Sequence, residues 1–199
     1  MFVRVVTFTG AGDIDGGLQF LKETVAPLLG QQHGWRGTTA SASRATGEFS
    51  VLTQWATKAD LDASESAMHK VRADAKDIIG GDLSVDVYEQ MVFDVVKPPK
   101  VGARLLVRPI SMALSKVDEN TEFFKSTVLA QIKSTPGYLA LRYLINRETG
   151  RGAVGSLWDT DEALNAAAKA AEERRAMGEQ RGISFGDLSK RETVFADLP

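Results

Sequence analysis

The sequence predicts an α+β protein in which one β-α-β-β-α-β unit is written twice in a single chain. Residues 15–73 align without a gap to residues 118–176, and 17 of these 59 pairs are identical, where chance gives roughly one in fifteen. The identical pairs include two tryptophans, Trp55 and Trp158. Strand and helix patterns follow one another in the same order in both copies. The prolines Pro98 and Pro99 lie between the copies, as expected of a stiff connector that joins no central strand.

The first copy begins with a strand, a helix and a hairpin. Phe2–Thr9 is rich in β-branched and aromatic residues, which is typical of a strand. Asp15–Leu29 carries apolar residues at the spacing of one helical face, with Asp15 as its predicted N-cap. Trp35–Arg44 and Glu48–Trp55 read as two strands joined by a turn that contains glycine.

A second helix and a last strand complete the copy. Thr57 is the predicted N-cap of this helix, and the pair Gly80-Gly81 is its predicted end. Val85–Val96 has the composition of a strand. The second copy repeats the pattern over Arg104–Ile110, Asp118–Lys133, Tyr138–Arg147, Ala153–Trp158, Thr160–Met177 and Ser184–Phe195.

This order of elements is that of a ferredoxin-like unit, with one antiparallel sheet and two helices on one face. Residues 1–96 are expected to form the first repeat, residues 97–100 the linker and residues 101–199 the second repeat. The uncovered face of each sheet is too apolar to stay in water. The two halves are therefore expected to close an α+β barrel as an intramolecular pseudo-dimer, while higher assembly stays open.

Composition excludes several classes of protein. The net charge is −2 and no basic stripe is present, which argues against a nucleic-acid partner. No apolar run reaches the roughly 20 residues that span a bilayer, and the N-terminus reads as a strand rather than a signal peptide, so a cytoplasmic location without a membrane partner is expected. The chain has no cysteine and two well-separated histidines, so a metal site is not expected.

Several motifs carry a resemblance to a known group of proteins. They are Pro-Gly-Tyr at 136–138, Asn-Arg-x-x-Gly at 146–150, Ser-Leu-Trp-Asp-Thr-Asp-Glu-Ala-Leu at 156–164 and its copy at 52–61. The chain resembles the dimeric α+β barrel superfamily, and within it the antibiotic-biosynthesis-monooxygenase-like group, over nearly its whole length and twice. The resemblance implies the fold; the group includes cofactor-independent oxygenases, heme-degrading enzymes and members without a known reaction.

The heme-degrading branch of that group can be compared residue by residue. Its pattern has an asparagine on the first strand, then a tryptophan and a histidine on the second helix. The matching positions in the two copies are Thr7 and Arg108, Ser64 and Ala167, and, close to the histidine position, His69 and Glu172. Two of the three signals are missing, so the comparison disfavours heme degradation.

His69 is the candidate catalytic residue, because the ordinary pKa of an imidazole lies near neutrality. It lies beside Met68 at the edge of the apolar helix face. The alternative is that His69 is a solvated residue at the flank of that face.

The candidate substrate-binding residues combine polar and aromatic side chains from both copies. Each also has a structural explanation: a tryptophan at a strand end can simply pack, and an arginine near an apolar face can extend its stem over the core. The binding alternative is a stacking wall for a flat ligand, or a clamp for a carboxylate or phenolate. These residues are Thr7, Trp55, Arg72, Arg108, Trp158 and Arg175.

The second strand differs in bulk between the copies. Thr39, Ser41 and Ser43 are small and hydroxylated where Arg142, Leu144 and Asn146 are large. Complementary packing explains this difference. A second hypothesis is that duplication freed one half to lose its pocket.

Three functions remain open at the sequence level. The first is an enzyme, a monooxygenase-like oxidoreductase that acts without a cofactor on a small apolar or aromatic molecule. The second is a non-catalytic ligand-binding or stress-associated module, and the third is a barrel filled by its own side chains. Convergent polar groups in a pocket would favour the first, and a dry apolar pocket the second.

Overall fold

The computed structural model describes residues 1–198 and confirms the predicted α+β fold. The strands pair in the order β7-β6-β4-β1-β3-β2-β9-β5-β8, and a further pairing of β7 with β5 closes eight of them into a barrel. Each repeat contributes the ferredoxin-like order, β4-β1-β3-β2 and β9-β5-β7-β6. The strands are β1 (Phe2–Thr9), β2 (Trp35–Ser43), β3 (Glu48–Trp55), β4 (Asp82–Val95), β5 (Arg104–Ser111), β6 (Tyr138–Ile145), β7 (Arg151–Trp158), β8 (Ser184–Phe185) and β9 (Ser189–Asp197).

Two compact units make up the described chain, and their boundaries cross those of the sequence repeats. Unit 1 holds residues 1–87, 100–102 and those from Glu192 onward, and unit 2 holds residues 88–99 and 103–191. Strand β4 starts in unit 1, and its second part pairs with β6, from Glu89 opposite Ile145 onward. Strand β9 likewise reaches β2, where Phe195 lies opposite Ala40. Each unit therefore takes part of its sheet from the last strand of the other repeat.

The first helix of each repeat contains a π-helical segment. In unit 1, α1 (Ile14–Phe20) continues through the π-helical Leu21–Val25 into α2 (Ala26–Gly30). In unit 2, a short 3₁₀ turn, Leu114–Lys116, leads into α5 (Val117–Phe123), the π-helical Phe124–Val128 and α6 (Leu129–Lys133).

The prediction that Asp15 caps the first helix is wrong. Asp13 is the N-cap, and its carboxylate accepts a hydrogen bond from the backbone nitrogen of Gly16 at 2.8 Å. Asp15 instead lies in the first turn, where its carboxylate binds Arg44 at 2.6 Å. An aspartate is favourable both at the N-cap and in the first turn of a helix, so the residue type does not distinguish Asp13 from Asp15. The backbone does: Asp13 has the non-helical angles φ −129° and ψ 81°, and the helix begins at Ile14.

The second helix of each repeat begins as predicted and is interrupted further on. Thr57 forms a capping box with Asp60 at the start of α3 (Lys58–Ala63), and Thr160 caps α7 (Asp161–Glu173). The first interruption is at Ser64, before α4 (Glu65–Ile79), and the second is at Arg174, before α8 (Arg175–Glu179).

The last predicted strand, Ser184–Phe195, is two strands. β8 pairs with the end of β5, where Phe185 lies opposite Ile110. The chain then leaves the sheet at Gly186, whose backbone nitrogen donates to the carbonyl of Pro109 at 2.9 Å. Because Pro109 has no N–H group, it cannot donate a backbone hydrogen bond in return, and the pairing of β8 with β5 ends there.

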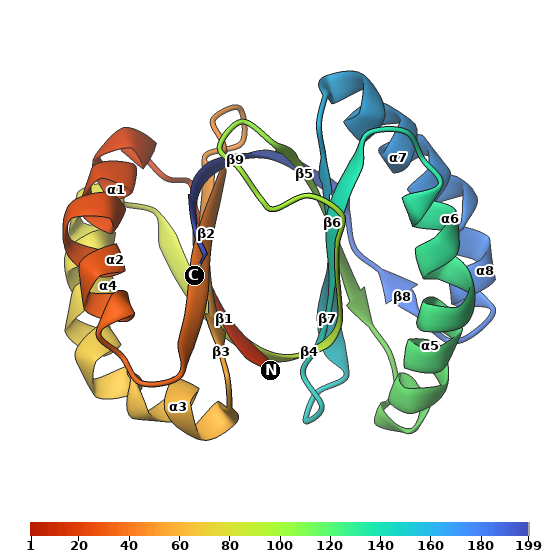
Figure 1. The fold of residues 1–199 in the computed structure, drawn as a ribbon, viewed down its shortest axis with the longest axis horizontal. Coiled ribbons are helices and arrows are strands. Elements are labelled where there is room, and N and C mark those ends of the chain that lie inside the picture. The colour runs from red at the N-terminus through yellow and green to blue at the C-terminus, as the bar shows by residue number, and fades with distance from the viewer. Residues whose placement is uncertain (199) are drawn as a thin grey trace. The chain divides into compact units, whose positions relative to one another are not determined.

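In each unit the helices cover one face of the strands (Figure 1). Phe8, Phe49 and Ile79 belong to the core of unit 1, and Tyr143, Ile145 and Trp158 belong to that of unit 2. Within residues 1–198, no helix combines the length and the apolar character that crossing a membrane requires.

Candidate functional site

Each unit holds a cavity between its helices and the helix-facing side of its strands. Cavity 1, in unit 1, has a volume of about 60 Å³, and cavity 2, in unit 2, about 100 Å³. Most of the lining is apolar in both. Cavity 1 is lined by Arg4, Val6, Phe8, Phe20, Leu21, Val25, Leu29, Val51, Met68, Val71, Arg72 and Ala75 among others, and cavity 2 by Arg108, Asn120, Phe123, Phe124, Val128, Ile132, Tyr143, Val154, Arg174, Met177 and Phe185 among others.

The π-helical segments form equivalent walls of the two cavities. Leu21 and Val25 line cavity 1, and Phe124 and Val128, at the same places in the second repeat, line cavity 2. A π turn widens the helix by one residue and turns side chains out of the regular pattern, and such turns occur often at functional sites. The two repeats therefore share this feature of the cavity wall as well as the order of their elements.

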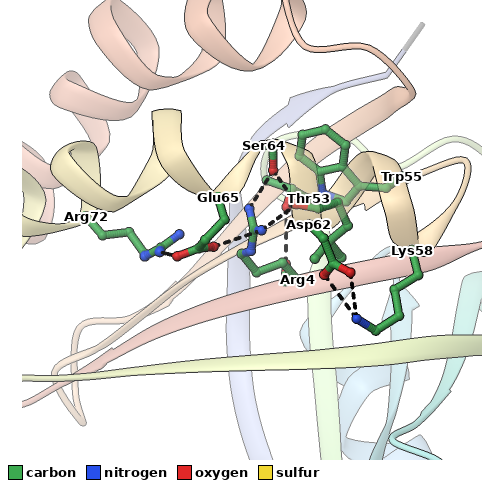
Figure 2. Close-up of polar contacts among 9 residues, drawn as sticks. Arg4, Thr53, Trp55, Lys58, Asp62, Ser64, Glu65 and Arg72 are labelled. Carbon is green, nitrogen blue, oxygen red and sulfur yellow. Dashed lines mark hydrogen bonds and ion pairs between the residues drawn. The ribbon is translucent and has the colours of Figure 1, made fainter.

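Arg4 supplies the most buried positive charge of cavity 1. It comes from β1, and only 3% of the residue is exposed. Its Nη1 donates to Ser64 Oγ at 3.0 Å (Figure 2). Its Nη2 donates to the carbonyl of Leu61 at 2.8 Å. Nη2 also lies 3.0 Å from a carboxylate oxygen of Glu65. Burial lowers the pKa of Arg4, and the negative charge of Glu65 opposes this effect.

The helix interruption at Ser64 creates the acceptors that Arg4 uses. At the end of α3 the carbonyl of Leu61 accepts hydrogen bonds from Arg4 Nη2 at 2.8 Å and from Ser64 Oγ at 2.7 Å. A guanidinium at the end of a helix also interacts favourably with the exposed carbonyls there. The ring of Trp55 lies beneath the guanidinium, 5.9 Å from its carbon.

Glu65 connects Arg4 with a second arginine of cavity 1. Arg72, about two turns after Glu65 on α4, forms an ion pair with the same carboxylate (Figure 2). Asp62, the neighbouring acid, is held by Lys58 at 2.8 Å. Two guanidinium groups therefore share one carboxylate, and this end of cavity 1 keeps an excess positive charge.

The second repeat replaces the Arg4–Ser64 contact by apolar residues. Arg4 lies opposite Thr53 on β3, and the residue opposite the equivalent Ser156 is Leu106. Ser64 corresponds to Ala167. Leu106 and Ala167 are both buried in the core of unit 2. The same place in the fold thus accepts either a hydrogen-bonded pair or an apolar one.

Cavity 2 nevertheless has its own arginines. Arg108 on β5 donates from Nη1 to the carbonyl of Gly186 at 2.7 Å and forms an ion pair with Glu172. Its guanidinium lies 5.9 Å from the centre of the Phe185 ring. Arg174 also lines the cavity, and burial lowers its pKa. Tyr143 adds a phenol, and burial raises its pKa to about 12.

The structure places the sequence-predicted site residues in three different environments. Arg72 lines cavity 1 and Arg108 lines cavity 2, in different units. Trp55 and Trp158 are fully buried beside the cavities, and their indole nitrogens donate to Thr53 Oγ1 at 3.0 Å and Ser156 Oγ at 2.9 Å.

The remaining predicted residues lie outside the cavity linings. Thr7 bonds Ser50 at 3.0 Å, whereas its neighbours Val6 and Phe8 are the ones that line cavity 1. His69 is exposed on α4. Arg175 reaches outward to Glu179 at 2.7 Å, and its neighbour Arg174 faces cavity 2 instead.

The hypothesis that one repeat had lost its pocket is wrong, because each repeat holds a cavity. The bulky Tyr143 does line cavity 2 without filling it. Arg142, which the same comparison singled out, lies in unit 2 over the ring of Phe93 at 4.1 Å and outside the cavity lining.

Neither cavity fits a heme as it stands. Among the residues that line them no histidine occurs, and their volumes lie below the roughly 150 Å³ of a cavity that holds benzene. No group of three or more acidic or histidine side chains with metal-binding geometry occurs in the described part of the chain.

Comparisons with known proteins give relatives of undetermined role and many structures of the same fold. No model of a protein family matches the chain. The uncharacterized protein Rv2557 of Mycobacterium tuberculosis is 25% identical over 187 residues, which cover 90% of this chain and 84% of that protein. The uncharacterized protein Rv2558 of the same organism is 21% identical over 187 residues, which cover 93% of this chain and 79% of that protein.

Three solved structures illustrate the fold. A candidate monooxygenase of Fusobacterium nucleatum superposes with a TM-score of 0.73 at 12% identity, over 99% of this chain and 94% of that one. An anthrone oxidase-like protein gives 0.68 at 15% identity, over 99% and 92%. A heme-binding protein of Thermus thermophilus gives 0.62 at 11%, over 98% and 91%. At these identities the likeness concerns the fold alone, an α+β barrel whose two ferredoxin-like repeats lie in one polypeptide.

Proposed function

We propose that this protein binds a small apolar or aromatic molecule in each of its two cavities and oxidises it with dioxygen, as a monooxygenase-like enzyme. One observation carries the proposal. Each unit has an apolar cavity, walled by a π-helical segment, into which a buried arginine from the first strand of the repeat projects. Apolar cavities with a few convergent polar groups are the usual form of small-molecule sites.

The arginines give such a site a defined chemical role. A guanidinium stabilises the anion that forms when a phenol or an enol of the substrate loses its proton, and the effect is larger in a site shielded from water. Arg4 and Arg72 supply this charge in cavity 1, and Arg108 and Arg174 supply it in cavity 2. Tyr143 is protonated near neutral pH, as an ordinary phenol is, and can donate a hydrogen bond; burial, which raises its pKa to about 12, extends this state to higher pH.

Anthrone is a suitable test substrate, since a protein of the same fold is described as anthrone oxidase-like. In the reaction, the methylene carbon of anthrone loses two hydrogens and gains one oxygen atom of dioxygen as a carbonyl. The other oxygen atom leaves with both hydrogens as water, so that anthraquinone is the product. Both cavities are smaller than one that holds benzene, so the three rings of anthrone enter only if side chains of the lining move apart. Met68 and Met177 are the flexible side chains of the two linings, and the proposal requires them to move.

A non-catalytic ligand-binding module is the second candidate. Its support is also in the linings, where no histidine, aspartate or glutamate occurs that could remove a proton from the substrate. His69, the chemically suited residue, is exposed and lies outside cavity 1.

The experiment measures binding and turnover of anthrone on the same preparation. Binding is followed without oxygen by NMR, through the amide signals of Val51 in cavity 1 and Val154 in cavity 2. Oxygen uptake and anthraquinone formation are then measured in air. Binding with uptake above the rate in buffer supports the enzyme. Binding without uptake supports the non-catalytic module, and the absence of both rejects anthrone-like ligands altogether.

A further inference from the structure

We propose that each cavity recognises the carboxylate of a small apolar acid, so that one chain binds two such anions, one in each repeat. This inference rests on the proposed binding function and adds the chemical class of the ligand. It follows from the balance of charge in each cavity and from the way in which the two repeats differ.

In cavity 1 the guanidinium groups outnumber their acidic partners. Glu65 forms ion pairs with both Arg4 and Arg72, and its side chain is 49% exposed. Asp62 also attracts Arg4, but its ion pair is with Lys58. Among the described residues, Arg72 Nη1 and Arg4 Nε are buried without a hydrogen-bond partner. A buried donor without an acceptor destabilises the fold, because it has lost its hydrogen bonds to water. A ligand carboxylate supplies that acceptor together with the missing negative charge.

Cavity 2 also has an arginine whose guanidinium no carboxylate binds directly. Glu172 pairs with Arg108 and, more distantly at 3.9 Å, with Arg175. The guanidinium of Arg174 lines the cavity and is partly buried, and among residues 1–198 it forms no side-chain hydrogen bond and no ion pair. The charge of Glu173 only partly opposes the effect of burial, which lowers the pKa of Arg174. The guanidinium of Arg174 is therefore the group available to an anion in cavity 2.

The charges of the two cavities occupy different positions of the repeat. Arg4 corresponds to Leu106, whereas Arg108 lies opposite Val154 and corresponds to Val6. Glu65 and Glu172 also differ in position, since residue 65 aligns with Ala168 and residue 172 with His69.

This difference separates ligand recognition from stability. Leu106 and Ala167 show that an apolar pair satisfies the core at the position of Arg4 and Ser64. Replacing a buried ion pair with packed apolar residues is often neutral or stabilising, so stability alone does not require the arginines. Each cavity nevertheless keeps two arginines, through different residues, and a common ligand charge explains why.

The lining determines the rest of the ligand. Apart from the arginines, cavity 1 is almost entirely apolar, and its volume of about 60 Å³ favours a slender chain over a ring. A planar carboxylate matches the geometry of a guanidinium better than a spherical anion does. Hexanoate is therefore the probe, and hexanamide, which has the same shape without the charge, is its neutral counterpart.

The test is an NMR titration with hexanoate and hexanamide, read at the amides of Val51 and Val154. Hexanoate is expected to shift both signals, and hexanamide to bind at least tenfold more weakly. Arg72→Met should weaken hexanoate at least tenfold at Val51 and leave Val154 unchanged, and Arg174→Met should do the reverse. Arg36→Met removes an exposed charge outside both cavities and should change neither signal.

The possible failures are distinguishable. If hexanoate and hexanamide bind equally, the cavities bind small molecules without distinguishing a carboxylate from a neutral amide. This inference is then wrong, while the proposed binding function stands. If neither probe shifts either signal, the binding function fails with it. If Arg72→Met does not fold, the double variant Arg4→Leu/Ser64→Ala, which copies the second repeat, removes the charge of Arg4 and gives the same test.

Discussion

At the scale of single residues, the contact between Arg4 and Ser64 links burial to hydrogen bonding. The guanidinium is buried, and two of its nitrogens are satisfied only because α3 stops before Ser64. Its third nitrogen, Nε, has no partner among the described residues. Because one nitrogen of the guanidinium already lacks an acceptor, removing a second acceptor should lower the free energy of unfolding.

We expect Ser64→Ala to lower the free energy of unfolding by about 1–3 kcal/mol, because it leaves Arg4 Nη1 buried without an acceptor. In an Arg4→Leu background the same substitution should cost less than about 0.5 kcal/mol, since the pair then copies Leu106 and Ala167. Urea denaturation of the four proteins in this cycle measures the coupling. Equal costs of Ser64→Ala in both backgrounds would show that the hydrogen bond contributes nothing.

Tyr143 predicts how stability changes with pH. Its pKa is about 12 in the folded protein and near 10 in an unfolded chain, so folding favours the protonated phenol. The contribution is complete below pH 10 and is lost as the pH rises toward 12, by up to about 3 kcal/mol. Tyr143→Phe should remove this part of the decline. The measurement compares urea unfolding of both proteins from pH 8 to pH 11.5, and parallel curves would contradict the assignment.

At the scale of elements, helix α1 approaches α4 closely because Gly17 has no side chain. A Cβ atom added at Gly17 would lie 2.5 Å from Cγ1 of Ile79, and both residues line cavity 1. Gly30, at the end of α2, offers the matched control, because a Cβ atom there would meet nothing within 4 Å.

Gly17→Ala should therefore lower the free energy of unfolding by about 1–2 kcal/mol relative to Gly30→Ala, because Ile79 must move. Gly30→Ala should itself be neutral or stabilising by up to about 1 kcal/mol, since alanine restricts the unfolded chain. Thermal and urea unfolding of the two variants measure this difference. Equal stability of the two would mean that α1 and α4 are not in close contact at Gly17.

The elements also show which features of a sequence can be predicted. Strands, hairpins and the caps at Thr57 and Thr160 follow from local rules and agree with the structure. The π-helical segments do not, since Leu21–Val25 keeps an ordinary helical composition and its widening depends on packing in the cavity. The interruption at Ser64 cannot be predicted from the sequence either, because serine also occurs within helices. The contact that Ser64 makes there, with Arg4, is visible only in the structure.

The candidate site could be predicted only in part for a related reason. Arg72 and Arg108 stood out because they lie near apolar faces or at a position of the resembling group, and both line a cavity. Arg4 and Arg174 carried no such signal. On a strand, a one-residue difference decides whether a side chain faces the helices, so Thr7 lies outside the lining that Val6 and Phe8 form. A helix places Arg174 and Arg175 about 100° apart with the same consequence.

At the scale of the whole molecule, the two repeats are connected by strands as well as by the linker. The second part of β4 pairs with β6, and the end of β9 pairs with β2. Consequently, neither compact unit consists of one sequence repeat alone. Pro98 lies exposed in the linker, whereas β4 just before it pairs with β6 from Glu89 to Val95, with one register shift between Gln90 and Val92.

Cutting the linker should therefore leave the protein assembled. With a protease site inserted between Pro98 and Pro99, we expect the two fragments to elute together at micromolar concentration and to keep the circular dichroism of the intact chain. Their melting temperature should then rise with protein concentration, because cleavage turns an intramolecular association into a bimolecular one. The uncut insertion variant is the control and should melt at a temperature independent of concentration. Separation into two folded fragments would show that each repeat completes its own sheet, which contradicts the pairing of β4 with β6 and of β9 with β2.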